Sequence, residues 1–154
     1  MWYEKEYLKG VISLKYKEKL SEILYRKYSR DINTLKIFKK LKEDLWDFNE
    51  EFELYFKASG NSSIDFEPKL TVCGKLNIEH FEKVLVTIDD LERLIVCEIH
   101  TEHPGIYVYD IESGKPVLRM KADSDESVTI LGFNNSKIQS DELLDIIIGN
   151  AFLR

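Results

Sequence analysis

The chain has 154 residues, 44% of them hydrophobic and 32% charged, and carries a formal net charge of −6. This composition excludes an intrinsically disordered chain, and the lack of an apolar run of about 18 residues excludes a membrane-spanning helix. The first residues, Met1 to Glu6, lack the apolar segment and cleavage site of a secretory signal, so we expect a cytoplasmic protein without a membrane partner.

Charge is divided unevenly along the chain. Residues 1–42 hold twelve lysines and arginines against five acidic residues, a net charge of +7. Residues 43–154 hold ten basic and 23 acidic residues, a net charge of −13. Such an asymmetry sets a field over the folded surface, and fields of this kind select partners and raise association rates. The charge pattern therefore directs attention to binding.

The first thirty residues predict helical structure. Apolar residues between Tyr16 and Tyr28 recur at helical spacing, which predicts a helix at about 17–29 with its tyrosines on a core-facing stripe. Residues 3–16 are assigned to helix as well, although part of this segment alternates like a strand, so both readings stay open there. We expect the first helix to pack antiparallel on the next one across a turn at residues 29–32.

The second quarter shows the clearest periodicity. Apolar residues step by three and four, which predicts an amphipathic helix over about 33–58. Asp31 or Asn33 is expected to cap its start, and the turn chemistry that begins at Gly60 is expected to end it. The stripe consists of Phe38, Leu41, Leu45, Phe48, Phe52 and Tyr55.

After residue 63 the pattern changes to short strands separated by turns. Connections of a few residues cannot form parallel crossovers, so the strands predict an antiparallel meander. The fold is predicted as one α+β domain, residues 1–154: an N-terminal pair of helices (about 1–60) on a five- to six-stranded sheet (about 64–134), with a closing helix (about 140–152). The expected strands are 64–70 or 64–72, 84–88, 94–100, 106–111, 116–121 and 128–133.

Both cysteines lie in apolar, strand-like runs. Cys73 and Cys97 are therefore expected to be buried and unreactive. Two cysteines without a C-x-x-C spacing give no zinc signature and do not establish a disulfide.

One short segment carries metal-ligand chemistry. Glu98, His100 and Glu102 would share a face of a strand, and His103 follows them. The simpler interpretation is a solvated strand face opposite a core side that includes Cys97, and we prefer it. A metal-dependent enzyme around His100, Glu102 and His103 is kept as a less favoured alternative; no catalytic residue, metal or cofactor is predicted.

The basic residues near the N-terminus suggest a second alternative, a nucleic-acid-associated protein. Cations interleaved with tyrosines supply phosphate partners and stacking rings. The net charge of −6 weakens attraction to a polyanion, and the sequence contains no helix-turn-helix or other motif that recognises nucleic acid. The residues concerned are Lys15, Lys17, Lys19, Arg26, Lys27 and Arg30.

The acidic sheet region gives the preferred prediction, a non-enzymatic binding protein that neutralises or regulates a basic protein partner such as a nuclease. Layout, size and acidic balance are compatible with immunity proteins and other small inhibitors, an analogy at the level of the fold. The expected partner-binding residues are Asp89, Asp90, Glu92, Glu98, Glu102, Tyr107, Tyr109, Asp123, Asp125 and Glu126.

Overall fold

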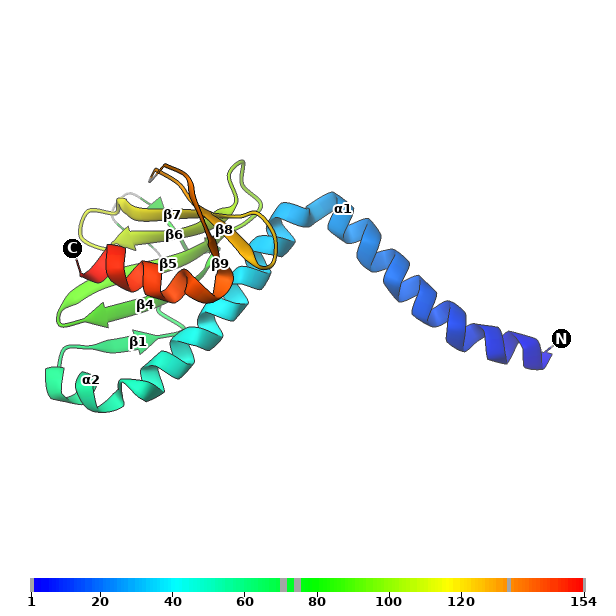
Figure 1. Ribbon diagram of the computed structural model, residues 1–154, viewed down its shortest axis with the longest axis horizontal. Coiled ribbons are helices and arrows are strands. Elements are labelled where there is room, and N and C mark those ends of the chain that lie inside the picture. Colours follow the sequence, from blue (N-terminus) through cyan, green and yellow to red (C-terminus); the bar gives the residue numbers. More distant parts are fainter. Residues whose placement is uncertain (1, 70–71, 74–75, 133, 154) are drawn as a thin grey trace.

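The computed structural model describes residues 2–69, 72–73, 76–132 and 134–153, with side chains described from residue 15 onward except at 70–77. The fold is α+β, as predicted: helices lie on a seven-stranded antiparallel meander, and helical turns close the chain (Figure 1). The sheet has the order β1-β4-β5-β6-β7-β8-β9, and β2 and β3 form a separate hairpin. The elements are α1 (Trp2–Glu51), α2 (Glu53–Ser59), β1 (Ser63–Asp65), β2 (Val72–Cys73), β3 (Leu76–Asn77), β4 (Glu82–Ile88), β5 (Leu91–Glu98), β6 (Gly105–Asp110), β7 (Pro116–Ala122), β8 (Ser127–Ile130), β9 (Ser136–Gln139), a 3₁₀ turn (Ser140–Glu142), α3 (Leu143–Ile147) and a π turn (Ile148–Phe152).

Helix α1 continues through the position where the sequence predicted a turn. Residues 29–32 contain no glycine or proline to stop a helix, and the chain bends at Tyr28 (φ −126°, ψ 27°) without reversing. The predicted antiparallel pairing across 29–32 is therefore wrong. The predicted helix at 17–29 is confirmed, and the backbone of residues 3–16 is helical too.

The bend divides α1 into two parts with different surroundings. The part before it, residues 2–27, projects away from the sheet and carries the N-terminus (Figure 1). We call residues 2–28, which include the residue at the bend, the arm and residues 32–153 the body. Within the described ranges, no helix has both the length and the apolar composition that a membrane crossing requires.

The part of α1 after the bend packs on the sheet through the predicted stripe. Phe38, Leu41, Leu45 and Phe48 are buried, and the same cluster contains side chains of the sheet and of α3. The buried part of this predicted helix face ends earlier than expected, because non-helical dihedral angles at Phe52 (φ −98°, ψ 15°) separate α2 from α1. Tyr55, predicted to lie on the stripe, is therefore exposed.

The predicted C-terminal end of this helical region is confirmed, whereas its predicted N-terminal end is wrong. Gly60 adopts a left-handed conformation (φ 72°) and donates its N–H to the Phe56 carbonyl at 3.1 Å, as a C-terminal cap does. The predicted caps at Asp31 and Asn33 are wrong, because the helix runs through both residues. Asn33 is buried and bonds to Tyr25 instead.

Hydrophobic side chains pack on both faces of the sheet. The face that carries Val84, Ile95 and Val108 packs against α1 and α3 and forms the main core. On the opposite face, a smaller cluster around Ile78 and Leu94 is covered in part by the segment that precedes β4. Strand alternation places the two sets on opposite sides of the sheet. The prediction that the β5 face carrying Glu98 is solvated is therefore wrong, because Leu94 and Val96 on that face are buried.

Several strand predictions need correction. The strand expected at 64–70 or 64–72 is short, because β1 covers only Ser63–Asp65, and the strand expected at 128–133 ends at Ile130. Strand β9, Ser136–Gln139, pairs with β8 and adds a seventh strand to the sheet. Only one of its side chains is even half-buried, so an apolar pattern did not reveal it. Strand β5 ends at Glu98 rather than at residue 100, because His100 has a positive φ of 59° that no regular strand accommodates.

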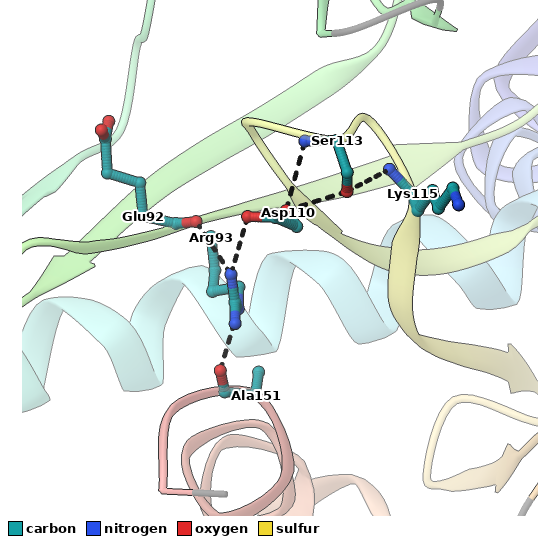
Figure 2. A network of polar contacts seen from close by, with 6 residues as sticks. All are labelled: Glu92, Arg93, Asp110, Ser113, Lys115 and Ala151. Atoms are coloured by element: carbon teal, nitrogen blue, oxygen red, sulfur yellow. Dashed lines mark hydrogen bonds and ion pairs between the residues drawn. The ribbon is translucent and has the colours of Figure 1, made fainter.

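An arginine ties the closing helical segment to the sheet. The Arg93 side chain, from β5, donates from Nε to the Ala151 carbonyl (2.9 Å) and from Nη1 to Oδ1 of Asp110 (3.0 Å), as Figure 2 shows. The hydroxyl of Ser113 donates a hydrogen bond to the same carboxylate (2.8 Å). This hydrogen bond is the main reason that the pKa of Asp110 lies below its ordinary value. The network fixes the carboxyl-terminal turn against the edge of the main core.

The position of Cys97 leads to a reactivity prediction. Its thiol is free and buried in the main core, and burial raises its pKa to about 12. The thiolate is the reactive form, so we expect Ellman's reagent to leave Cys97 unlabelled in the folded protein and to label it after unfolding in urea. The side chain of Cys73 lies outside the described residues, so the measurement uses a Cys73→Ser variant. Rapid stoichiometric labelling without denaturant would contradict the burial.

Candidate functional site

Four of the ten predicted partner-binding residues lie together on the sheet face opposite the helices. Glu98, Glu102, Tyr107 and Tyr109 line a hollow of about 440 Å³ together with Arg119. The β6–β7 register sets Tyr107 directly opposite Arg119, which is why β7 contributes to the same hollow. We call this site the sheet hollow.

Hydrogen bonds and burial shape the chemistry of the sheet hollow. The Tyr109 hydroxyl donates to the carboxylate of Glu98, and the Tyr107 hydroxyl donates to the His103 carbonyl at 2.5 Å. Burial is the first cause that raises the pKa of Glu98, and burial likewise raises the pKa values of both tyrosines. The tyrosines therefore act as neutral donors and apolar walls rather than as bases.

The raised pKa of Glu98 predicts an unusual substitution effect. Folding disfavours the ionised form of Glu98, so above its folded-state pKa this residue lowers the free energy of unfolding. This penalty disappears as the pH falls through the folded-state pKa and the carboxyl becomes protonated. We expect Glu98→Gln, which keeps an oxygen for the Tyr109 hydroxyl, to raise the free energy of unfolding at about pH 8 and to have less effect near pH 4. Urea unfolding across this range measures it. Glu102→Gln, an exposed neighbour in the same hollow, is the control, and a Glu98→Gln loss that grows with pH would contradict the expectation.

The other predicted acidic residues do not join this hollow. In a meander, successive turns alternate between the two ends of the sheet, so the β4–β5 and β7–β8 turns lie at opposite ends. Asp89 and Asp90 occupy the first turn with positive φ angles, and Glu92 follows them on β5. Asp123, Asp125 and Glu126 lie in the second turn. The structure therefore places the ten residues in separate regions rather than in one patch.

Several of these acids have local structural roles. The side chain of Asp90 accepts from the Asn61 amide (3.2 Å), and the backbone N–H of Asp89 donates to Ser62 (2.9 Å). The Asp123 carboxylate accepts from the Thr129 hydroxyl at 2.5 Å. These contacts hold turns in place and give the carboxylates of Asp90 and Asp123 partners within the chain.

The structure separates the residues of the metal alternative. His100 faces α1, with its Nδ1 3.4 Å from Oδ2 of Asp31, whereas Glu102 and His103 line the sheet hollow. Among the described residues, no group of three or more histidines, cysteines and acids is placed to hold a metal ion. The expected alignment of Glu98, His100 and Glu102 on one strand face is wrong, because β5 ends at Glu98.

The arm exposes a row of large apolar side chains. Every described side chain from Lys15 to Tyr28 is exposed, and the apolar ones among them have exposed fractions between 41% and 65%. The prediction that these tyrosines face the core is therefore wrong. We call the row the apolar stripe; its members are Tyr16, Leu20, Ile23, Leu24 and Tyr28.

Charges are placed asymmetrically around the apolar stripe. Successive residues of a helix are turned by about 100°, which puts Lys17 and Lys27 within the stripe and Lys19 beside it. The same rotation puts Glu18 and Glu22 on the opposite side of the helix. Among residues 15–28, whose side chains the structure describes, a molecule that covers the stripe therefore meets lysines and no carboxylate.

Two side-chain contacts support the bend at the base of the arm. The Tyr25 hydroxyl and the Asn33 amide bond to each other across it at 3.1–3.2 Å. The Thr34 hydroxyl donates to the Arg30 carbonyl at 2.7 Å. Asn33 and Thr34 are both buried, so the direction of the arm is fixed from the body side.

A second hollow lies at the base of the arm, where α1 meets β6 and β7. It has a volume of about 310 Å³, and its lining includes three cations, Arg30, Arg119 and Lys121, with no carboxylate. We call it the basal pocket; it shares His103, Tyr107 and Arg119 with the sheet hollow. Of these cations only Arg30 was among the predicted nucleic-acid residues. Arg119 and Lys121 were not predicted, although their alternation with buried Leu118 and Met120 marks them as outward-facing.

Neither a scan against protein-family models nor searches of curated proteins and of solved structures find a match to this chain.

Proposed function

We propose that this chain is a protein-binding module whose binding element is the apolar stripe of the arm. The observation that carries the proposal is the exposure of five large apolar side chains along one side of a projecting helix. Helices in proteins gain most of their stability by packing an apolar face, and a face left open in this way is typical of a docking surface. Anchors at positions i, i+4, i+7, i+8 and i+12 fit recognition of a helix in a groove.

The proposed partner is a protein with an apolar groove edged by carboxylates. Lys17, Lys19 and Lys27 accompany the stripe, so a groove with acidic edges pairs charges as the apolar surfaces meet. A second copy of the arm would set lysines against lysines, a repulsion that disfavours self-pairing. Tyrosines at both ends of the stripe are the residue type that often dominates protein interfaces.

Face-selective photo-crosslinking in living cells tests this proposal. A benzophenone amino acid replaces Leu20 or Leu24 on the stripe, or Glu18 or Glu22 on the opposite side as matched controls. We expect an adduct with an acidic protein from the stripe positions and none from the controls. Equal yields from both faces, adducts of twice the chain mass, adducts with lipid or nucleic acid alone, or no adduct would each contradict the proposal.

A second candidate function uses the sheet hollow and retains the predicted basic partner. Its support is the gathering of Glu98, Glu102, Tyr107 and Tyr109 in one concavity, where carboxylates and aromatic rings suit a basic side chain of an inhibited protein. If this function holds, Glu102→Lys weakens binding of the captured partner and Lys19→Glu does not. The reverse result favours the arm.

For both functions we propose the cytoplasm, where a free thiol such as Cys97 stays reduced.

A further inference from the structure

We propose that the basal pocket binds a phosphomonoester. This inference does not depend on the arm's partner, because no residue of the apolar stripe lines the pocket. Its cations come from two elements, Arg30 from α1 and both Arg119 and Lys121 from β7. The fold therefore brings together positive charges that lie far apart in the sequence.

The described lining of the pocket holds no carboxylate; an acidic group whose pKa responds to one of the three cations is Glu98, in the adjoining sheet hollow, which Arg119 also lines. Among the described residues none forms an ion pair with Arg30, Arg119 or Lys121, and the described lining of the pocket holds no acidic side chain. Glu98 offsets part of the charge of Arg119 only, so an anion that enters the pocket still reduces the repulsion among the three cations. The site is thus electrostatically suited to an anion before any ligand arrives.

The number and type of the cations favour a phosphate group over a carboxylate. A phosphomonoester carries nearly two negative charges and three acceptor oxygens. Two guanidinium groups, each with a planar fork of donors, and one ammonium group can share those oxygens. A carboxylate offers two oxygens and one charge, so it would leave part of the positive charge unbalanced.

The rest of the pocket indicates what the phosphate is attached to. The volume of about 310 Å³ exceeds what a bare phosphate fills and lies at the lower end of ligand pockets. Pro104, Ala122 and Leu131 add an apolar surface, and the ring of Tyr107 adds a flat wall. A small apolar or aromatic group bearing the phosphate therefore fits better than inorganic phosphate does.

Titration of the full-length protein with phenyl phosphate at constant ionic strength tests the proposal. The arginine Nε–Hε NMR signals report binding, and benzoate and inorganic phosphate are the comparison anions. We expect saturable shifts at Arg30 and Arg119, with phenyl phosphate binding about tenfold tighter than either comparison anion. No saturation, or benzoate binding as tightly as phenyl phosphate, would overturn the proposal, as would inorganic phosphate binding equally well.

Substitutions test whether phenyl phosphate binds in the basal pocket. The double variant Arg119→Gln/Lys121→Gln removes two exposed cations and is expected to weaken phenyl phosphate binding at least about tenfold. Lys115→Gln, an exposed cation in the β6–β7 turn at the other end of the sheet, is expected to change it less than about twofold. Equal losses in the two variants would show a general charge effect and refute the site.

A phosphotyrosine peptide with neutral flanking residues distinguishes the two sources of a phosphomonoester. Tighter binding of the peptide than of phenyl phosphate identifies a phosphorylated protein as the source. Equal or weaker binding of the peptide identifies a free phosphorylated small molecule. Either result supports the basal pocket as a phosphomonoester site.

Discussion

Phe38→Ala is expected to lower the free energy of unfolding by about 3–5 kcal/mol, through lost burial and the cavity left behind. Phe38 is fully buried in the main core, where α1 meets the sheet. Domains of this size are stable by only about 5–15 kcal/mol, so the loss is a large part of the total. Urea unfolding followed by circular dichroism measures it as a lower midpoint with an unchanged m-value.

The neighbouring Lys39→Ala serves as the matched control. Lys39 is exposed on the same turn of α1, so the substitution is expected to change the free energy of unfolding by less than about 0.5 kcal/mol. A Phe38→Ala loss below about 1 kcal/mol would mean that α1 does not pack on the sheet as described.

Amide hydrogen exchange is expected to differ strongly between the two parts of α1 in the free protein. Residues 16–27 have no packed face, so their hydrogen bonds open at a cost near zero. Residues 37–48 are held by the main core, so their amides are expected to exchange at least about a thousandfold more slowly. Exchange followed by mass spectrometry or NMR resolves the change at the bend.

This expectation has two informative controls. The amides of β5 and β6, in the middle of the sheet, are expected to be protected like residues 37–48. Addition of the crosslinked partner is expected to protect residues 16–27 without changing the sheet. Strong protection of the arm in the free protein at low concentration would mean that its apolar stripe is already covered.

The sequence predicted the element types well because local periodicity reports which face of an element is apolar. It correctly placed Phe38, Leu41 and Leu45 in the core, since the sheet provides a surface for that face. The same spacing around Leu20 predicted burial and was wrong, because beyond the bend the body offers no surface to the arm. Periodicity identifies a face that can be buried, whereas tertiary structure decides whether anything covers it.

The candidate sites were harder to predict because they depend on register and on the path of α1. Alternation along β6 predicts that Tyr107 and Tyr109 share a face, and the sheet hollow contains both. Their neighbour Arg119 follows only from the β6–β7 register. The basal pocket also requires α1 to pass the end of β7, and no local pattern in residues 28–34 fixes that course.

The separation of the acidic residues has a topological cause. Net charge summed over residues 43–154 suggested one acidic surface, but turns of a meander alternate between its ends. Asp90 and Asp125 are therefore far apart although both belong to acidic turns. Charge totals along a sequence predict the sign of a region, not a patch.

If the apolar stripe of the arm docks a protein with acidic groove edges, substitutions on the two sides of the arm must change the affinity for that protein very differently. The dissociation constant of the crosslinked partner is measured for the unaltered chain, for Leu20→Ala/Leu24→Ala and for Glu18→Ala/Glu22→Ala. All four substitutions favour helix, so arm structure is maintained. We predict a loss of about a hundredfold for the leucine pair, as for central interface residues, and less than about threefold for the glutamate pair. Equal affinities for all three proteins would contradict the claim.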